Sequence, residues 1–113
     1  MHEMSIIQNI LDDVEQNLSK AEYSKVINIK IKVGEFIALD PSSLQFCYKA
    51  LTNGTKFENT ELLIETIPLT GICNNCKQQI NINNFLFVCG ECASDNVEII
   101  SGQELILSEI NVD

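Results

Sequence analysis

Apolar residues follow two different periods in the first third of the chain. Between positions 4 and 20 they recur every three or four residues, at Met4, Ile7, Leu11, Val14 and Leu18. This spacing predicts an amphipathic helix with one buried stripe. From residue 26 to 33, apolar residues alternate with asparagine and lysine until Gly34 ends the run. Strict alternation predicts a strand that buries one face.

A second helix and two further strands follow. Asp40 and Pro41 predict a helix start, because a carboxylate can cap the first turn and proline fits the first helical position. Asn53 and Gly54 supply its end. Cys47 falls on the apolar face of this helix, where we interpret it as a small core residue. Residues 61–67 and 104–110 predict two more strands.

The segment between those two strands contains most of the cysteines of the chain. Pro68 and Gly71 break the strand pattern and lead into a module that contains four of the 5 cysteines. Within it, residues 80–82 and 85–88 predict the two arms of a hairpin that turns at residues 83 and 84. Residues 97–100 predict one more short strand, which Gly102 ends.

The cysteines of this module form two C-x-x-C pairs, Cys73 with Cys76 and Cys89 with Cys92. Two such turns can close a tetrahedron around one ion, which predicts a Zn2+ site. With four thiolates no vertex is left for water, so the site is structural rather than catalytic. Two disulfides or a redox dithiol are the alternatives. The start of the sequence lacks a signal-peptide pattern, so we expect a reducing, cytoplasmic location that favours metal.

These elements predict an α+β fold with two helices packed on a small three-stranded mixed sheet and an inserted zinc-ribbon-like module. Because short connections reverse the chain direction, the first two strands should be parallel and the last antiparallel to them. We expect residues 1–69 plus 103–113 to form the α/β domain. Residues 70–102 should form the zinc-binding module.

The same reversal places both helix starts, with His2 and Asp40, at the end from which the cysteine module emerges. His2 is the only histidine, and it adjoins the α-amine of Met1. The amine, the imidazole and nearby amide nitrogens, with Glu3 as a further donor, form a nitrogen-rich set that suits Ni(II) or Cu(II). An ordinary surface histidine is the competing interpretation.

The charge narrows the choice of partners. The chain carries 7 basic and 16 acidic residues, a formal net charge of −9. Such a surface repels phosphate backbones, which argues against nucleic acid and favours cations or a basic partner. No apolar run is long enough for a membrane span. No nucleophile paired with a base and no phosphate-cradling glycine loop is evident, so we expect a protein that is not an enzyme.

Several segments together resemble the HypA family of hydrogenase nickel-incorporation proteins. They are residues 1–5, 33–35, 40–55, both C-x-x-C pairs and 102–105. The resemblance covers essentially the whole chain in the family's order. It implies a nickel metallochaperone in which His2 and Glu3, with the Met1 amine and backbone nitrogens, bind Ni2+. It also implies structural Zn2+ on the four paired cysteines, and it makes Asp40 a candidate further residue at the nickel end.

The resemblance also implies partners. Members of the family hand nickel to the [NiFe]-hydrogenase large subunit together with the GTPase HypB, and in some bacteria they also serve urease maturation. A monomer or weak homodimer without membrane or nucleic-acid partners is expected. Two alternatives remain, a zinc-ribbon protein-interaction module without nickel binding and a thiol–disulfide enzyme.

Overall fold

The structure is a computed structural model of the 113-residue chain, and it describes residues 3–113. It divides into two compact units. Unit 1 comprises residues 3–32, 39–65 and 105–113 of the described chain, and unit 2 comprises residues 33–38 and 66–104. Within residues 3–113 no helix is both long and apolar enough to cross a membrane.

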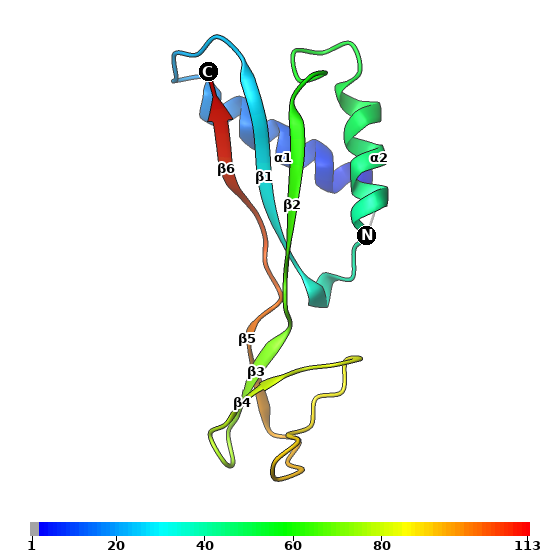
Figure 1. The fold of residues 1–113 in the computed structure, drawn as a ribbon, viewed down its shortest axis with the longest axis vertical. Coiled ribbons are helices and arrows are strands. Elements are labelled where there is room, and N and C mark those ends of the chain that lie inside the picture. The colour runs from blue at the N-terminus through cyan, green and yellow to red at the C-terminus, as the bar shows by residue number, and fades with distance from the viewer. Residues whose placement is uncertain (1–2) are drawn as a thin grey trace. The chain divides into compact units, whose positions relative to one another are not determined.

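The first unit contains both predicted helices. Helix α1 spans Glu3–Leu18 and buries Ile6, Ile7, Ile10, Leu11, Val14 and Leu18. The predicted stripe is therefore confirmed except at its start, because the Met4 side chain is 44% exposed. The second helix, α2, spans Pro41–Thr52 and packs against α1. Figure 1 shows α1 running across the sheet behind the strands and α2 beside strand β2.

The start and the inner face of α2 agree with the sequence. The Asp40 carboxylate accepts hydrogen bonds from the backbone N–H of Ser43 at 3.3 Å and from the Ser43 hydroxyl at 3.1 Å. These bonds satisfy a donor that the first helical turn would otherwise leave unpaired. Cys47 is buried beside Leu44 and Tyr48, so its interpretation as a core residue is confirmed.

The sheet of three strands that packs with these helices is mixed, as predicted. Its strands are β1 (Val26–Gly34), β2 (Glu61–Ile67) and β6 (Leu105–Val112), in the order β2-β1-β6. Asp113 donates its backbone N–H to the carbonyl of Lys25 at 2.9 Å, which sets β6 antiparallel to β1. Figure 1 shows β1 and β2 running in the same direction and β6 in the opposite one.

The second unit has a three-stranded antiparallel sheet that the sequence did not predict as a sheet. Its strands are β3 (Thr70–Cys73), β4 (Gln79–Asn81) and β5 (Val97–Ser101), in the order β4-β3-β5. The strand expected near residue 97 is confirmed as β5, whereas the expected break at Gly71 is wrong. Gly71 lies inside β3, where a Cβ would come within 2.8 Å of the Glu98 carbonyl oxygen on β5. A close strand contact therefore requires this glycine.

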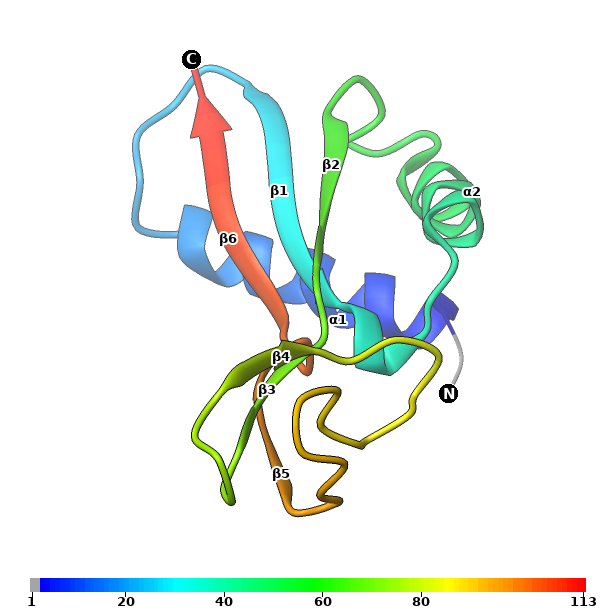
Figure 2. The ribbon, with the colours of Figure 1, turned by 60° about the horizontal axis from the view of Figure 1, so that its bottom comes forward.

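The predicted hairpin within the cysteine module is wrong. Residues 79–81 do form a strand, but it pairs with β3, and residues 85–88 belong to no strand. Asn84 and Phe85 both have left-handed backbones, with φ of 55° and 58°, which cannot continue an extended arm. The four consecutive apolar residues at 85–88 are exposed or half-buried rather than paired across a ladder, and Figure 2 shows the irregular course of this segment.

Two glycines bring the flanking segments of the second unit together. The backbone N–H of Phe36 donates to the Gly102 carbonyl at 2.8 Å, in a short 3-10 turn, η1, over Glu35–Ile37. A Cβ on Gly34 would overlap that same carbonyl. Gly102 has φ of 106°, a conformation that L side chains rarely adopt. The predicted break at Gly102 is confirmed, and its cause is this close approach.

Candidate metal centre

The four paired cysteines come together in the second unit. Cys73 is the last residue of β3 and Cys76 lies in the turn after it, whereas Cys89 and Cys92 precede β5. Their four Sγ atoms all lie within 4.8 Å of one another. Cys73 and Cys89 are buried, Cys76 is half-buried and Cys92 is exposed. The site therefore sits at the surface with one side facing solvent.

Both C-x-x-C turns have the same backbone hydrogen bonds. In the first turn, Cys73 donates its N–H to Gln78 at 2.9 Å and its carbonyl accepts from Lys77 at 2.7 Å. In the second turn, the Cys89 N–H donates to Ser94 at 2.9 Å. The carbonyl of Cys89 then accepts from Ala93 at 2.9 Å. The two C-x-x-C turns therefore have the same local hydrogen-bond pattern.

The residue after the second cysteine of each turn is left-handed. Lys77 has φ of 67° and Ala93 has φ of 61°. For residues with a side chain this conformation costs on the order of 1 kcal/mol. It turns the chain sharply enough for both thiols of a pair to point to one centre. The matching positions of these two residues show that both turns have the same backbone shape.

The geometry fits a tetrahedral zinc ion. Zn–S bonds of about 2.3 Å imply sulfur–sulfur edges of about 3.8 Å in a tetrahedron. The Sγ atoms of Cys73 and Cys92 are 3.6 Å apart, as are those of Cys76 and Cys89. Two further groups point at sulfur, the Glu91 N–H at 3.4 Å from the Cys89 Sγ and the Asn75 side-chain amide at 3.4 Å from the Cys92 Sγ. Such donors favour thiolates, the form that binds metal.

The pKa shifts differ among the cysteines of the cluster. The backbone N–H of Cys76, with smaller contributions from neighbouring groups, lowers the pKa of Cys73 to about 6. Although the Gln78 backbone lowers it, burial and the three neighbouring thiols raise the pKa of Cys76 to about 12. The Asn75 amide lowers the pKa of Cys92. Four thiolates this close repel one another, so a cation is needed to hold all of them ionised.

Of the predicted nickel residues, only Glu3 and Asp40 fall within the described part of the chain. His2 and Met1 are outside the described residues, so the proposed coordination there stays a prediction. Glu3 is the first residue of α1 and is half-buried, and Asp40 caps α2. Asp40 thus has a structural role whether or not it also contacts a metal.

Some contributors to the cysteine site were missed in the sequence. Asn75 reaches from the first turn to a sulfur of the second, and the Asn74 amide donates to the Asn96 side chain at 3.2 Å. The two asparagines between Cys73 and Cys76 were a signal for such bonds, since asparagine commonly bonds to nearby turns. Their partners could not be identified without the register of β5.

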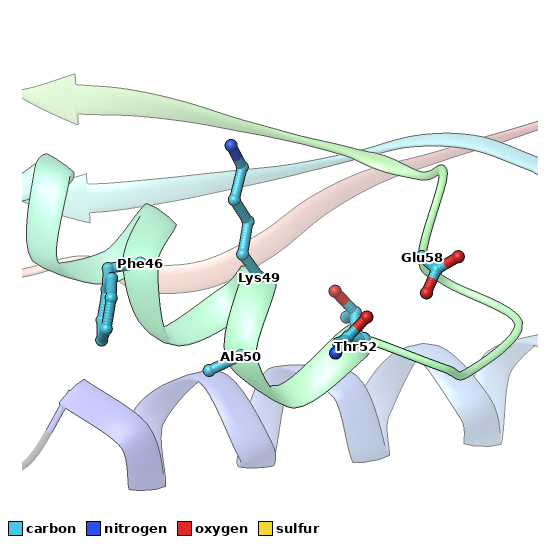
Figure 3. Close-up of a pocket in the computed structure, with 6 residues that line it drawn as sticks. Phe46, Lys49, Ala50, Thr52 and Glu58 are labelled. Carbon is cyan, nitrogen blue, oxygen red and sulfur yellow. The ribbon is translucent and has the colours of Figure 1, made fainter.

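A separate hollow lies in the first unit, on α2 and the turn after it (Figure 3). Its volume is about 470 Å³, and its lining residues are Phe46, Lys49, Ala50, Thr52, Asn53 and Glu58. Figure 3 shows Phe46 and Ala50 on the side of α2 nearer to α1. Phe46 is 73% exposed, but the lining offers no set of metal ligands. The metal chemistry of the described chain is therefore concentrated at the four cysteines.

Fold and site together define a class: a small α+β metal-binding protein with a zinc-ribbon-like unit. The family model described as "Hydrogenase/urease nickel incorporation, metallochaperone, hypA" matches residues 1–112. The chain belongs to this HypA family, so the resemblance found in the sequence is confirmed. The family is one of nickel metallochaperones for hydrogenase, which use zinc and nickel.

Individual relatives agree with the family assignment. Hydrogenase maturation factor HypA of Desulfitobacterium hafniense (strain DSM 10664 / DCB-2) is 32% identical over 113 residues, covering 100% of this chain and 99% of the relative. The protein of the same name from Chlorobaculum parvum is 35% identical and covers 100% of both chains.

Two solved structures have the same fold. The solution structure of the Ni metallochaperone HypA from Helicobacter pylori is 24% identical, with a TM-score of 0.67 over 99% of this chain and 97% of that chain. A second solution structure of a HypA protein has a TM-score of 0.71 over 99% and 96%, also at 24% identity. The predicted α+β fold with a zinc-ribbon-like module is confirmed.

Proposed function

We propose that this chain carries Ni(II) at its N-terminus and delivers it during [NiFe]-hydrogenase maturation. The observation that carries the proposal is the family match over residues 1–112, which spans both the Met-His-Glu start and the four cysteines. The ligands proposed for nickel are the Met1 amine, His2 and Glu3 with backbone nitrogens. Asp40 is an additional candidate at the same end.

In this proposal zinc is resident and nickel is cargo. Zn2+ is bound by Cys73, Cys76, Cys89 and Cys92. It neutralises the thiolates and links the two C-x-x-C turns of the second unit. Residues 1–69 plus 103–113 act as the nickel-binding domain, and residues 70–102 act as the zinc module. A site with four thiolates has no vertex for exchange, whereas a terminal amine and an imidazole exchange protons and metal readily. This difference supports a division between a permanent and a transferable metal.

The packing of α1 and the protonation of the proposed ligands also support nickel transfer. Glu3 opens α1, whose first turns are anchored by the buried Ile6 and Ile7. The proposed ligands are therefore attached directly to a packed helix, so metal capture need not order a long tail. Free α-amines and imidazoles have reference pKa values of about 8 and 6.5. Both must lose protons to bind, so nickel affinity should fall as the pH drops from about 7.5 to 6.

The partners in this proposal are the GTPase HypB and the [NiFe]-hydrogenase large subunit, in the cytoplasm, with urease maturation proteins as further clients in bacteria that have them. The role is transfer without catalysis, by a monomer or weak homodimer. The alternative is a zinc-ribbon interaction module that binds no nickel. The two proposals differ in one measurable property, which is specific nickel binding at the first residues.

Calorimetric titration of nickel separates these proposals. The proteins are wild type, His2→Ala, and a form with one extra N-terminal residue, each at pH 7.5 and pH 6. We expect His2→Ala to lose specific nickel binding and to keep its zinc. The extended form should lose most of its binding, because its Met1 nitrogen becomes an amide. Asp40→Asn tests whether Asp40 contributes to nickel binding.

The outcomes are distinct. If wild type binds no nickel specifically, the interaction-module alternative is correct. If the extended form binds nickel as tightly as wild type, the amine is not a ligand and the proposed coordination is wrong. If zinc is lost from His2→Ala, the variant has damaged the second unit, and His2→Gln replaces it in the same titration.

A further inference from the structure

A groove runs along the free edge of β4 in the second unit. Its volume is about 360 Å³, and it lies between β4 and the loop that carries Leu86, Val88 and Glu91. We call it the β4 groove and define it by these residues together with Gln79, Ile80 and Asn81 on the strand. None of the four cysteines lines it. It is assigned no role by the function proposed above.

One wall of the groove is an unpaired strand edge. The sheet order β4-β3-β5 leaves β4 at an edge. Cys73 donates to the carbonyl of Gln78 and Ile82 donates to that of Leu69, both at 2.9 Å. Because bonding alternates along an antiparallel pair, Gln79 and Asn81 direct their N–H and C=O groups away from β3. An edge of this kind accepts another strand unless it is protected.

The opposite wall is apolar and held in place. Leu86 is 66% exposed and Val88 is 39% exposed. The Phe85 and Phe87 rings both pack edge-on against Phe36, with centroids 6.0 Å and 6.4 Å apart. The loop is therefore fixed on both sides of its exposed leucine. Exposed apolar side chains on a fixed loop are typical of a docking surface.

The acidic charge around the groove favours a basic binding segment. Glu91 lines the groove itself. The acidic residues of the second unit, residues 33–38 and 66–104, are Glu35, Glu91, Asp95, Glu98 and Glu104, against the single basic residue Lys77. A bound segment must therefore tolerate a negative field, which lysine and arginine do best.

We propose that the β4 groove binds an extended segment of a partner protein as an added strand, with apolar side chains alternating with lysine or arginine. The backbone of the segment bonds to Gln79 and Asn81. Its apolar side chains cover Ile80, Leu86 and Val88, and its basic side chains face Glu91. This is recognition by strand addition, in which main-chain bonds give affinity and alternate side chains give specificity. The proposal does not depend on nickel binding.

A second copy of this chain fits the groove poorly. Each copy carries a formal net charge of −9. Pairing two β4 edges would bring two acidic second units together, and like charges across an interface cost several kcal/mol. A basic segment removes that repulsion, which is why the charge favours a different partner.

The test uses the zinc-loaded full chain and a blocked peptide of alternating valine and lysine. Titration calorimetry measures binding to wild type, Leu86→Ser and Asn81→Pro. Proline is tolerated on an edge strand where the N–H faces outward, so β4 should survive in the last variant. Ile106→Ser is the control, because Ile106 is 49% exposed on β6 in the other unit. We expect Leu86→Ser and Asn81→Pro each to weaken binding about tenfold, and Ile106→Ser to leave it unchanged.

A second peptide separates strand addition from charge attraction without altering the protein. It has the same sequence with alternate amides N-methylated, which blocks main-chain bonding on one edge. We expect it to bind about tenfold more weakly than the unmodified peptide. Amide exchange at Gln79 and Asn81 should slow when the unmodified peptide is bound.

Three results would overturn the proposal. Equal binding of the methylated peptide would show that the contact is only electrostatic. Wild-type affinity in Leu86→Ser and Asn81→Pro would place the peptide elsewhere. Sedimentation that shows a wild-type dimer, made monomeric by Asn81→Pro, would assign the groove to a second copy of this chain.

Discussion

The two units of this protein are stabilised in different ways. The first unit has an apolar core in which Ile7, Ile29, Ile31, Val14 and Leu44 are fully buried. In the second unit the fully buried side chains are Leu69 and Ile82 together with two thiols, Cys73 and Cys89. Several large apolar side chains of the second unit are exposed, including Phe85 at 50% and Leu86 at 66%. One unit is stabilised by apolar burial, whereas the other needs its metal ligands.

The difference shows how one short chain can combine a unit with an apolar core and a unit that depends on a metal site. A small unit with few buried apolar residues needs a cross-link or a metal to fold. Zinc on four thiolates supplies this, and it must stay bound for the unit to persist. The first unit has its own apolar core, so its stability should not require a bound metal. We expect perturbations of one unit to leave the other folded.

The largest expected effect comes from breaking the metal site. Cys73→Ser should remove zinc and largely unfold residues 72–95, because metal binding contributes on the order of 10 kcal/mol in small zinc modules. The helices and the β2-β1-β6 sheet should remain. Amide exchange mapped by NMR measures both results in one sample. Asn74→Ser is the control, since it alters the same turn without removing a thiol. Unchanged zinc content in Cys73→Ser would show that the site is not essential to the unit.

The second effect comes from opening a cavity in the first unit. Leu44 is fully buried on α2, and Leu44→Ala should lower the free energy of unfolding of this unit by about 2–5 kcal/mol. Zinc content should be unchanged, because the second unit does not depend on this core. Thermal unfolding monitored by circular dichroism, with zinc measured in parallel, tests both statements. Loss of zinc in this variant would mean that the two units fold as one.

A smaller effect involves the hydroxyl of Tyr48. It donates to the carbonyl of Thr60 at 2.9 Å, and burial raises the pKa of Tyr48 from 10.0 to about 12. Tyr48→Phe leaves that carbonyl without its donor and should cost about 1–3 kcal/mol at neutral pH.

The raised pKa also gives a pH dependence. As the pH rises from 10 toward 12, the unfolded state loses the Tyr48 proton first, so wild type becomes less stable. Tyr48→Phe should lack this part of the decline. Urea unfolding of both proteins at pH 8 and pH 11 measures the difference, and a stability gap that stays constant between the two values would contradict this account.

The smallest effect concerns the fifth cysteine. Cys47 is buried on α2 and lies apart from the four clustered thiols. Cys47→Ala should cost roughly 1 kcal/mol and keep both the zinc and the nickel stoichiometry. Metal analysis and urea unfolding test these expectations. A lost metal equivalent would show that Cys47 belongs to a metal site.

The sequence predicted the first unit well because its signals are local. The stripe of α1, the Asp40-Pro41 start of α2 and the alternation of β1 depend on neighbours a few residues away. The run from Ile29 to Val33 buries its alternate residues as expected. Ile27, by contrast, is 46% exposed near the beginning of the strand, where the same alternation gives no burial.

The second unit was predicted only at its cysteines. Their spacing is typical of a zinc site, and the structure brings all four sulfur atoms together. The strands around them could not be paired from the sequence, because β4 has only 3 residues and carries no apolar period. The apolar run at residues 85–88 imitates a strand, although its backbone at Phe85 is left-handed. Tertiary contacts with Phe36, far away in sequence, decide its conformation.

The strand order β2-β1-β6 sets an order of events during synthesis. The last strand to leave the ribosome pairs with the first one made, and the whole stretch between β2 and β6 must be looped out meanwhile. Loop closure becomes more costly with length, by about 0.6 kcal/mol for each doubling. Pairing of Thr70 with Ser101 holds the two ends of that stretch together once the second unit has folded. Zinc that is available to the nascent chain should therefore speed completion of the β2-β1-β6 sheet, although none of the four clustered cysteines lies in that sheet.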